Sequence, residues 1–154
     1  MLSHAEIVSN QVRYNILQRE VEEEVLPYCK KNGIAILAWA PIASGVLSGK
    51  YSENSPPADQ RKTYAALFRT ENLHEIDGVT RVLKVIADRR GKTIAQVALN
   101  WLISSPLGPI VPIPGAKNGA QAKENAGVAS WNLFADELDS INKAAAQVKL
   151  NYFP

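Results

Sequence analysis

Lys117 follows a proline-glycine break at the end of an apolar run, and this arrangement is typical of an anion site. The run 110–113 reads as a strand, Pro114 and Gly115 interrupt it, and Asn118 is suited to cap a helix that begins directly afterwards. Helix N–H groups beside a lysine side chain attract phosphate or carboxylate groups. The alternative interpretation is a strand-to-helix turn with a solvated lysine, and this motif alone does not decide between the two.

Two further apolar runs carry side chains that could contact the same ligand. Gln11 places an amide inside the strand-like run 7–13, where the alternative is a buried amide that bonds to the backbone. Trp39 ends the apolar run 34–39, and a glycine-rich loop leads from it to Lys50. A core tryptophan and a solvated loop lysine are the alternatives for these two residues.

Hydrophobic periodicity and capping signals predict the elements that must position these residues. Gly33 and Gly91 are expected to end helices, and Thr93 lies where an N-cap is expected. Pro27 is expected to leave only the second half of the first helix regular. The sequence predicts strands at 7–13, 34–39 and 109–113, and helices at 20–32, 71–90, 93–104, 118–127 and 135–148.

This order of elements is typical of βα units around a parallel sheet. Right-handed crossovers then place the helices on one face of the sheet. Gln11, Trp39 and the segment 115–117 all fall at or near the C-terminal ends of the predicted strands, which is where barrels of this type bind ligands. The sequence therefore predicts an α/β fold of about three parallel strands with flanking helices.

Composition narrows the class of protein. The chain has 154 residues, 46% hydrophobic and 21% charged, so we expect residues 1–154 to form one globular domain. A net charge of +2 does not favour nucleic-acid or membrane partners. The single cysteine, Cys29, suits a reducing cytoplasm, and residues 1–6 show no signal peptide. His4 and His74 are isolated, so no metal site is predicted.

The segments 7–15, 33–51 and 112–127, in this order, closely resemble the C-terminal part of an aldo-keto reductase. These enzymes are NADP(H)-dependent carbonyl reductases built on a (β/α)8 TIM barrel. The resemblance extends from about Ile7 to about Val148. It implies a partial TIM barrel that consists of the last three βα units and a C-terminal helix.

The resemblance also implies a role for individual residues. Gln11 matches the glutamine that pairs with the nicotinamide carboxamide, and Trp39 matches the aromatic residue that stacks on the nicotinamide ring. Ala40 stands where many relatives have a serine, and Lys117 matches the cation beside the adenosine 2′-phosphate, which favours NADP over NAD. The implied cofactor-binding residues are Gln11 and Trp39, then Ala40, Pro41, Ile42 and Ser44 at the pyrophosphate, Lys50 in the closing loop, and Gly115, Ala116, Lys117, Gln121, Glu124 and Asn125 around the adenosine phosphate.

The family's catalytic aspartate, tyrosine, lysine and histidine come from the first half of the barrel. This chain begins at what resembles the sixth strand, so we assign no catalytic residue to it. We expect weak NADP(H) binding and no carbonyl reduction by the chain alone. Phe134 stands where relatives usually have a serine that caps the last helix, which puts the start of that helix in doubt.

A sheet of three parallel strands cannot close on itself, so its edges and its barrel-facing side remain open. We therefore expect a homo-oligomer that forms through the sheet edges and the barrel-inner face. Three interpretations remain open at this point. The chain is the cofactor half of a reductase, or an oligomeric scaffold that binds no cofactor, or a reductase that becomes active with a separate N-terminal half.

Overall fold

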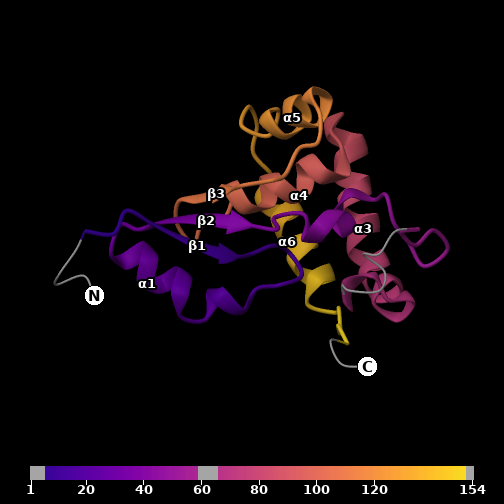
Figure 1. Ribbon diagram of the computed structural model, residues 1–154, viewed down its shortest axis with the longest axis horizontal. Helices are drawn as coiled ribbons and strands as arrows, with labels where there is room; N and C mark the ends of the chain where they lie inside the picture. The colour runs from indigo at the N-terminus through magenta and orange to yellow at the C-terminus, as the bar shows by residue number, and fades with distance from the viewer. Residues whose placement is uncertain (1–5, 59–65, 152–154) are drawn as a thin grey trace.

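The computed structural model describes residues 6–58 and 66–151 of the chain. Figure 1 shows an elongated molecule in which a small sheet and helix α1 lie at one end, helix α3 lies at the other, and α6 lies between them. The elements in chain order are β1 (Ser9–Arg13), the 3-10 turn η1 (Glu20–Glu22), α1 (Val25–Lys31), β2 (Ala35–Trp39), η2 (Ala43–Ser48), η3 (Ala66–Phe68), α3 (Thr70–Arg90), α4 (Ile94–Ile103), β3 (Ile110–Pro112), α5 (Gly119–Ala126) and α6 (Ala135–Ala145).

The three strands are parallel and follow the order β1-β2-β3. Gln11 lies opposite Leu37, and Leu37 lies opposite Val111, so these three side chains project from the same face of the sheet. The other face carries Ile36 and Ile110, which are buried against the helices. The predicted α/β fold with three parallel strands and helices on one face is therefore confirmed.

The hydrophobic core extends from the sheet, on which α1 and α4 pack, through α4 to α3 and from there to α6. Helix α4 is apolar around most of its circumference because it contacts β3, α3, α5 and the turn η2. Burial of one large aliphatic side chain contributes about 1.5–3 kcal/mol, so this layer supplies much of the folding free energy. The fully enclosed side chains include Leu47, Phe68, Leu73, Ile76, Leu83, Leu99, Leu102 and Ile141.

Local capping explains where the helices begin and end. Thr93 and Gln96 form a reciprocal capping box, in which Gln96 N–H donates to Thr93 Oγ1 and Thr93 N–H donates to Gln96 Oε1. Gly91, at φ 59°, provides the left-handed residue that ends α3. The predicted ends of these two helices are therefore correct to within one residue. Pro27 lies in the first turn of the short helix α1, where its missing N–H costs no hydrogen bond.

The last helix begins at Ala135 without a hydroxyl cap. Glu137 Oε2 accepts the Phe134 N–H at 2.8 Å, and the same carboxylate receives two hydrogen bonds from the Arg90 guanidinium. The Arg90 guanidinium carbon lies 3.8 Å from the Phe134 ring centroid, so Phe134 covers this ion pair. The bonds from Arg90 lower the pKa of Glu137. The predicted start of this helix is correct, whereas it ends at Ala145 and not at residue 148.

A second polar cluster joins β1 to the helices. Tyr14 is fully buried, and its hydroxyl donates to Glu22 Oε1 at 2.7 Å. Arg19 donates to both oxygens of Glu22 and to Asn142 Oδ1 on α6. Trp101 Nε1 donates to the same Asn142 oxygen at 3.1 Å. Burial and the bond to Glu22 raise the pKa of Tyr14 far above its ordinary value, so this hydroxyl stays protonated and acts as a structural donor.

The described residues contain neither a membrane-spanning helix nor a cluster of metal ligands. No helix in the described ranges is long and apolar enough to cross a membrane. In residues 6–58 and 66–151 no group of three or more His, Cys, Asp or Glu side chains is placed to hold a metal ion.

Candidate functional site

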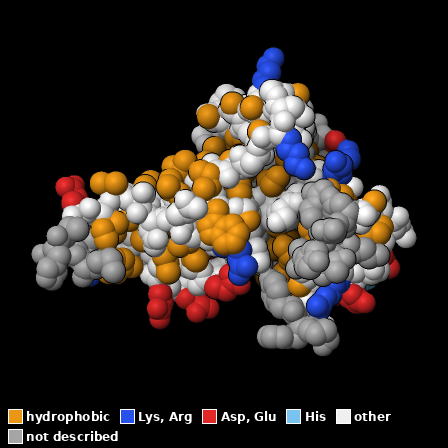
Figure 2. Space-filling model, viewed as in Figure 1, with side chains coloured by type: hydrophobic (Ala, Val, Ile, Leu, Met, Phe, Trp, Pro, Cys, Tyr) orange, Lys and Arg blue, Asp and Glu red, His pale blue; other side chains and the backbone are white. Residues whose placement is uncertain are grey.

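Gln11 and Trp39 lie on the same open face of the sheet. The register pairs Gln11 with Leu37 and Arg13 with Trp39, so Gln11 and Trp39 are diagonal neighbours on adjacent strands. Trp39 is 43% exposed, and Val111 on β3 and Ile113 just after it are exposed to a similar extent. Figure 2 shows hydrophobic side chains gathered over this part of the sheet. The face can therefore accept a flat aromatic group against the indole ring, with an amide close by.

Arg13 also belongs to this face, although it was not predicted as a site residue from the sequence. Its guanidinium carbon lies 5.9 Å from the centroid of the Trp39 ring, at the C-terminal end of β1. A guanidinium near an aromatic ring is attracted to its electron-rich face. The spacing of the strand residues could have indicated it, because Arg13 lies two residues after Gln11 and strand residues with this spacing share one face of the sheet.

Asn15 holds together the loops that follow β1 and β2. Its side chain is fully buried. Nδ2 donates to Gln18 Oε1 and to Ala40 O, both at 3.0 Å, and Oδ1 accepts the N–H groups of Leu17 and Gln18. Asn15 thus uses both of its donor hydrogens and its acceptor oxygen, and it fixes the first residue after β2.

The loop after β2 has an unusual backbone. Ala40, Ala43 and Ser44 have φ values of 49°, 49° and 57°, in the left-handed region that residues other than glycine rarely adopt. Each such residue costs about 1–2 kcal/mol, and such conformations cluster at ligand-binding loops. Pro41 is buried and Ser44 is exposed. Among the predicted pyrophosphate contacts, a Pro41 contact would therefore have to come from its backbone, whereas the Ser44 hydroxyl is accessible.

Lys50 lies further along the same loop, after a turn closed by Ser48 Oγ, which donates to Gly45 O at 2.6 Å. Its side chain is exposed, with Nζ 6.0 Å from the centroid of the Tyr51 ring. Three residues on, Glu53 Oε2 lies 2.8 Å from His74 Nδ1 on α3. The hydrogen bond to Glu53 and the negative charge of Glu53 raise the pKa of His74. This ion pair fixes the far end of the loop to α3.

The loop after β3 is held in place at the start of α5 by Asn118 and Gln121. Asn118 caps α5, because its Oδ1 accepts the Gln121 N–H at 3.0 Å. Gln121 Oε1 in turn accepts the Lys117 N–H at 2.7 Å, and Asn125 Nδ2 lies 3.5 Å from Gly115 O. The Lys117 side chain is exposed beside the first turn of the helix. The loop is thus held by its own helix while its cation faces solvent.

Three residues expected to contact the ligand directly are engaged within the protein. Gln121 and Asn125 bond to the loop backbone as described above, and the Glu124 carboxylate accepts a 2.6 Å hydrogen bond from Thr93 Oγ1 on α4. Gln96 Nε2 also donates to Glu124 O. Sequence spacing places these residues correctly on the face of α5 near the loop, but it does not reveal the competing partners on α4. Their first role in this structure is to position the loop and α5.

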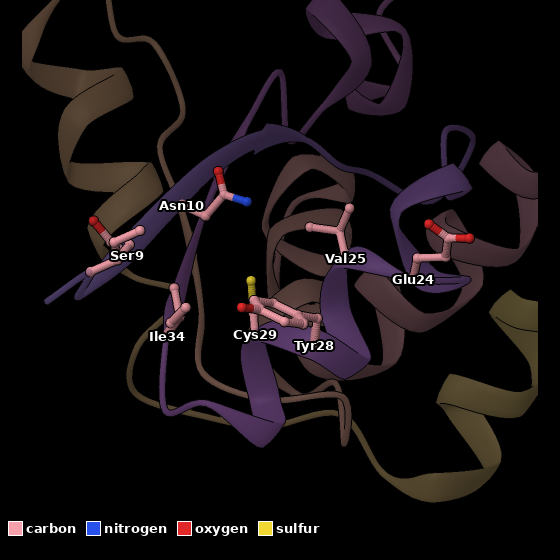
Figure 3. A pocket seen from close by; sticks show the side chains of 8 residues that line it. Ser9, Asn10, Glu24, Val25, Tyr28, Cys29 and Ile34 are labelled. Atoms are coloured by element: carbon pink, nitrogen blue, oxygen red, sulfur yellow. The ribbon is translucent and has the colours of Figure 1, made fainter. Parts of the chain in front are cut away.

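Two partly open hollows lie away from these residues. A cavity of about 480 Å³ lies between β1 and α1, and Figure 3 shows Ser9 and Asn10 on one side of it and Glu24, Val25, Tyr28 and Cys29 on the other. A second cavity, of about 400 Å³, lies beside Tyr14 and Trp101. Neither is lined by a residue predicted to bind the cofactor, so the candidate site is an open surface at the C-terminal ends of the strands.

Comparison with known proteins relates this arrangement to one family. A model of the aldo/keto reductase family matches residues 2–146. An uncharacterized oxidoreductase of Mycobacterium bovis is 36% identical over 139 residues, which cover 90% of this chain and 42% of that protein. The chloroplastic pyridoxal reductase of Arabidopsis thaliana is 34% identical over 142 residues, which cover 92% of this chain and 37% of that protein.

A solved structure shows the same fold. The glycerol dehydrogenase of Gluconobacter oxydans superposes with a TM-score of 0.82 at 24% identity, over 95% of this chain and 44% of the dehydrogenase. The three-stranded sheet with its helices is therefore part of a barrel fold. The chain spans about two-fifths of the length of the relatives that it matches.

Proposed function

Because this chain belongs to the aldo/keto reductase family, we propose that it binds NADP(H) weakly through the C-terminal ends of its strands. The observation that carries this proposal is the exposed Lys117 at the start of α5, on a loop that Gln121 and Asn125 hold in place. A preorganised loop next to helix N–H groups and a cation suits the adenosine 2′-phosphate of NADP(H).

The open face of the sheet supports the nicotinamide end of the proposal. The Trp39 indole is accessible for stacking, and the Gln11 amide lies on the neighbouring strand. Ser44 offers a hydroxyl in the strained loop between these two ends of the cofactor. Arg13 adds a positive charge next to the Trp39 ring, and a cation there would favour the reduced, uncharged nicotinamide over the oxidised, positively charged one.

Carbonyl reduction by this chain alone is not part of the proposal. None of the residues of this sequence matches the family's catalytic aspartate, tyrosine, lysine and histidine, so the proposal covers cofactor binding and assigns no catalytic residue. The lone cysteine, Cys29, is buried and unpaired, which supports a reducing compartment such as the cytoplasm.

Titration with NADPH and NADH, followed by quenching of tryptophan fluorescence, tests the proposal. We expect NADPH to bind more tightly than NADH, and binding to weaken as salt is added. Lys117→Ala should weaken NADPH binding roughly tenfold, because a hydrogen bond to a charged group is lost. Lys123→Ala is the matched control, since Lys123 is an exposed lysine at the other end of α5, and it should change little.

Two results would contradict the proposal. Equal affinity for NADPH and NADH would remove the role assigned to the 2′-phosphate. Equal effects of Lys117→Ala and Lys123→Ala would show that the loop after β3 is only a turn with a solvated lysine.

A further inference from the structure

Helix α5 carries the Lys117 loop, and its own sequence offers little apolar surface to hold it in place. Between Gly119 and Ala126 the helix has alanine and no larger apolar residue. Hydrophobic stabilisation grows with the apolar area that is covered, so these methyl groups contribute little to the placement of α5. Polar contacts must therefore do much to fix where the helix lies, and with it where its first turn presents Lys117.

The first turn of α4 supplies polar contacts to α5, which lies beside it (Figure 1). Gln96 Nε2 donates to Glu124 O at 2.8 Å, and Thr93 Oγ1 donates to the Glu124 carboxylate at 2.6 Å. Both bonds reach the last turn of α5, whereas the loop from β3 joins its first turn. The helix is thus attached at both ends, and α4 holds the end that lies away from Lys117.

The two ends of the Gln96 amide make separate contacts. Oε1 accepts the Thr93 N–H at 3.0 Å and completes the cap of α4, which a glutamate could also do. Nε2 donates to α5, and a glutamate at neutral pH has no such donor. A Cβ at Gly127 would lie 2.8 Å from Gln96 Nε2, so the glycine leaves room for the amide. The amide and the glycine thus suit a contact between the two helices that the cap alone does not require.

We propose that Gln96 is a positioning residue for the NADP(H) site. Its amide fixes the last turn of α5, and the helix then holds Lys117 where the adenosine 2′-phosphate binds. Gln96 acts through α5 and not by contact with the cofactor, and this inference rests on the NADP(H) binding proposed above. Without the amide bond α5 samples positions in which Lys117 misses the phosphate. The measured affinity then falls with the fraction of chains that keep the competent position.

Two variants that share only the loss of this donor test the proposal. Gln96→Glu keeps the acceptor that caps α4, and Gln96→Met adds no charge near the phosphate groups. Each should raise the dissociation constant of NADPH roughly fivefold, because one hydrogen bond is lost. NADH lacks the 2′-phosphate, so its dissociation constant should change by less than about twofold. Gln147→Glu is the matched control, since Gln147 is an exposed glutamine outside α4 and α5, and it should change neither constant.

Hydrogen exchange without cofactor measures the placement of α5 directly. The protection factors of the α5 amides and of the Lys117 amide should fall in both Gln96 variants. Those of α4 should stay unchanged in Gln96→Glu, because its cap is retained. Gly127→Ala perturbs the same contact from the other side, since its Cβ displaces the Gln96 amide, and it should produce the same fall. Circular dichroism should confirm that each variant is folded.

Three outcomes would overturn the inference. The first is unchanged protection of α5 in both Gln96 variants. The second is a loss of NADPH affinity confined to Gln96→Glu, because the new charge and not the lost donor would then be its cause. The third is NADPH binding that responds to Lys117→Ala but to neither Gln96 variant. Failure of the unchanged chain to bind NADPH would instead refute the function proposed above, and the exchange measurement would then decide by itself whether Gln96 positions α5.

Discussion

Replacement of Asn15 by alanine should destabilise the protein strongly, because this side chain joins the loops after β1 and β2. It makes four hydrogen bonds at 3.0–3.1 Å from a fully buried position. Two of the partner groups keep a second bond in its absence. The Ala40 carbonyl still accepts from Ala43 N–H, and the Gln18 N–H still donates to the residue 15 carbonyl. Leu17 N–H loses the Asn15 oxygen that it donates to.

These bonds set the magnitude of the effect. A net contribution of about 1 kcal/mol for each of four bonds gives a loss of about 3–4 kcal/mol, reduced slightly by the bonds that remain. For a chain of this size, that loss lowers the melting temperature by roughly 10 °C. Ala40 should also leave its left-handed conformation more easily, because the Asn15 amide no longer holds its carbonyl.

Urea denaturation of the unchanged chain and of Asn15→Ala measures this difference. Asn132→Ala is the control, since Asn132 is an exposed asparagine, and it should change the free energy of unfolding by less than about 0.5 kcal/mol. Asn15→Asp separates the bonds that the side chain accepts from those that it donates. A carboxylate still accepts the N–H groups of Leu17 and Gln18, but its negative charge repels the Ala40 carbonyl oxygen. This variant should gain stability as the pH falls and the carboxylate binds a proton.

A loss below about 1 kcal/mol for Asn15→Ala would refute this reasoning. It would mean that water or loop relaxation replaces the buried amide, and that the conformation after β2 does not depend on Asn15. A pH-independent Asn15→Asp variant would likewise show that the bond to Ala40 contributes little.

Two further predictions concern backbone space and pH. Gly78→Ala should stabilise the protein by about 0.5–1 kcal/mol, because a Cβ at this position of α3 meets open space. Gly49→Ala should destabilise the protein by more than that, because its φ is 72° and its Cβ would collide with Ile94. Urea denaturation of both variants measures the two changes in the free energy of unfolding, which should have opposite signs. The His74–Glu53 contact should hold the loop after β2 most firmly below about pH 6.5 and release it as the pH rises through the raised pKa of His74. The protection factors of the amides in residues 52–55, which correct for the intrinsic pH dependence of exchange, should therefore fall over that range. His74→Ala should abolish this fall, while the protection factors in α4 stay unchanged in both proteins.

Much of the fold could be predicted from local signals. Each capping residue acts within one turn of its own position, so the helix ends that these residues predict are correct to within one or two residues. The capping residues are Thr93 with Gln96, Asn118, Gly33 and Gly91. The end of the last helix was predicted three residues too late, because the apolar spacing continues to Val148 after the helical hydrogen bonds end.

The candidate site was predicted less completely. Sequence spacing placed Gln121 and Asn125 on the correct face of α5, but their hydrogen bonds to the loop backbone depend on how the chain turns at Gly115. Glu124 bonds to Thr93, which lies far away in sequence and becomes a neighbour only when α5 packs on α4. Arg13 was missed because the register of β1 against β2 decides that it lies beside Trp39.

The sequence by itself determined the kinds of element, their order, their caps and the family, because these depend on residue types within a few positions of one another. Tertiary structure alone decided which polar groups already have partners, as Glu124 does in Thr93 and Asn15 does in Gln18 and Ala40. It also decided, through the register of β1 against β2, that Arg13 lies beside the Trp39 ring. Hydrogen-bond satisfaction is a property of three-dimensional neighbours, so it follows from packing and strand register and not from local sequence.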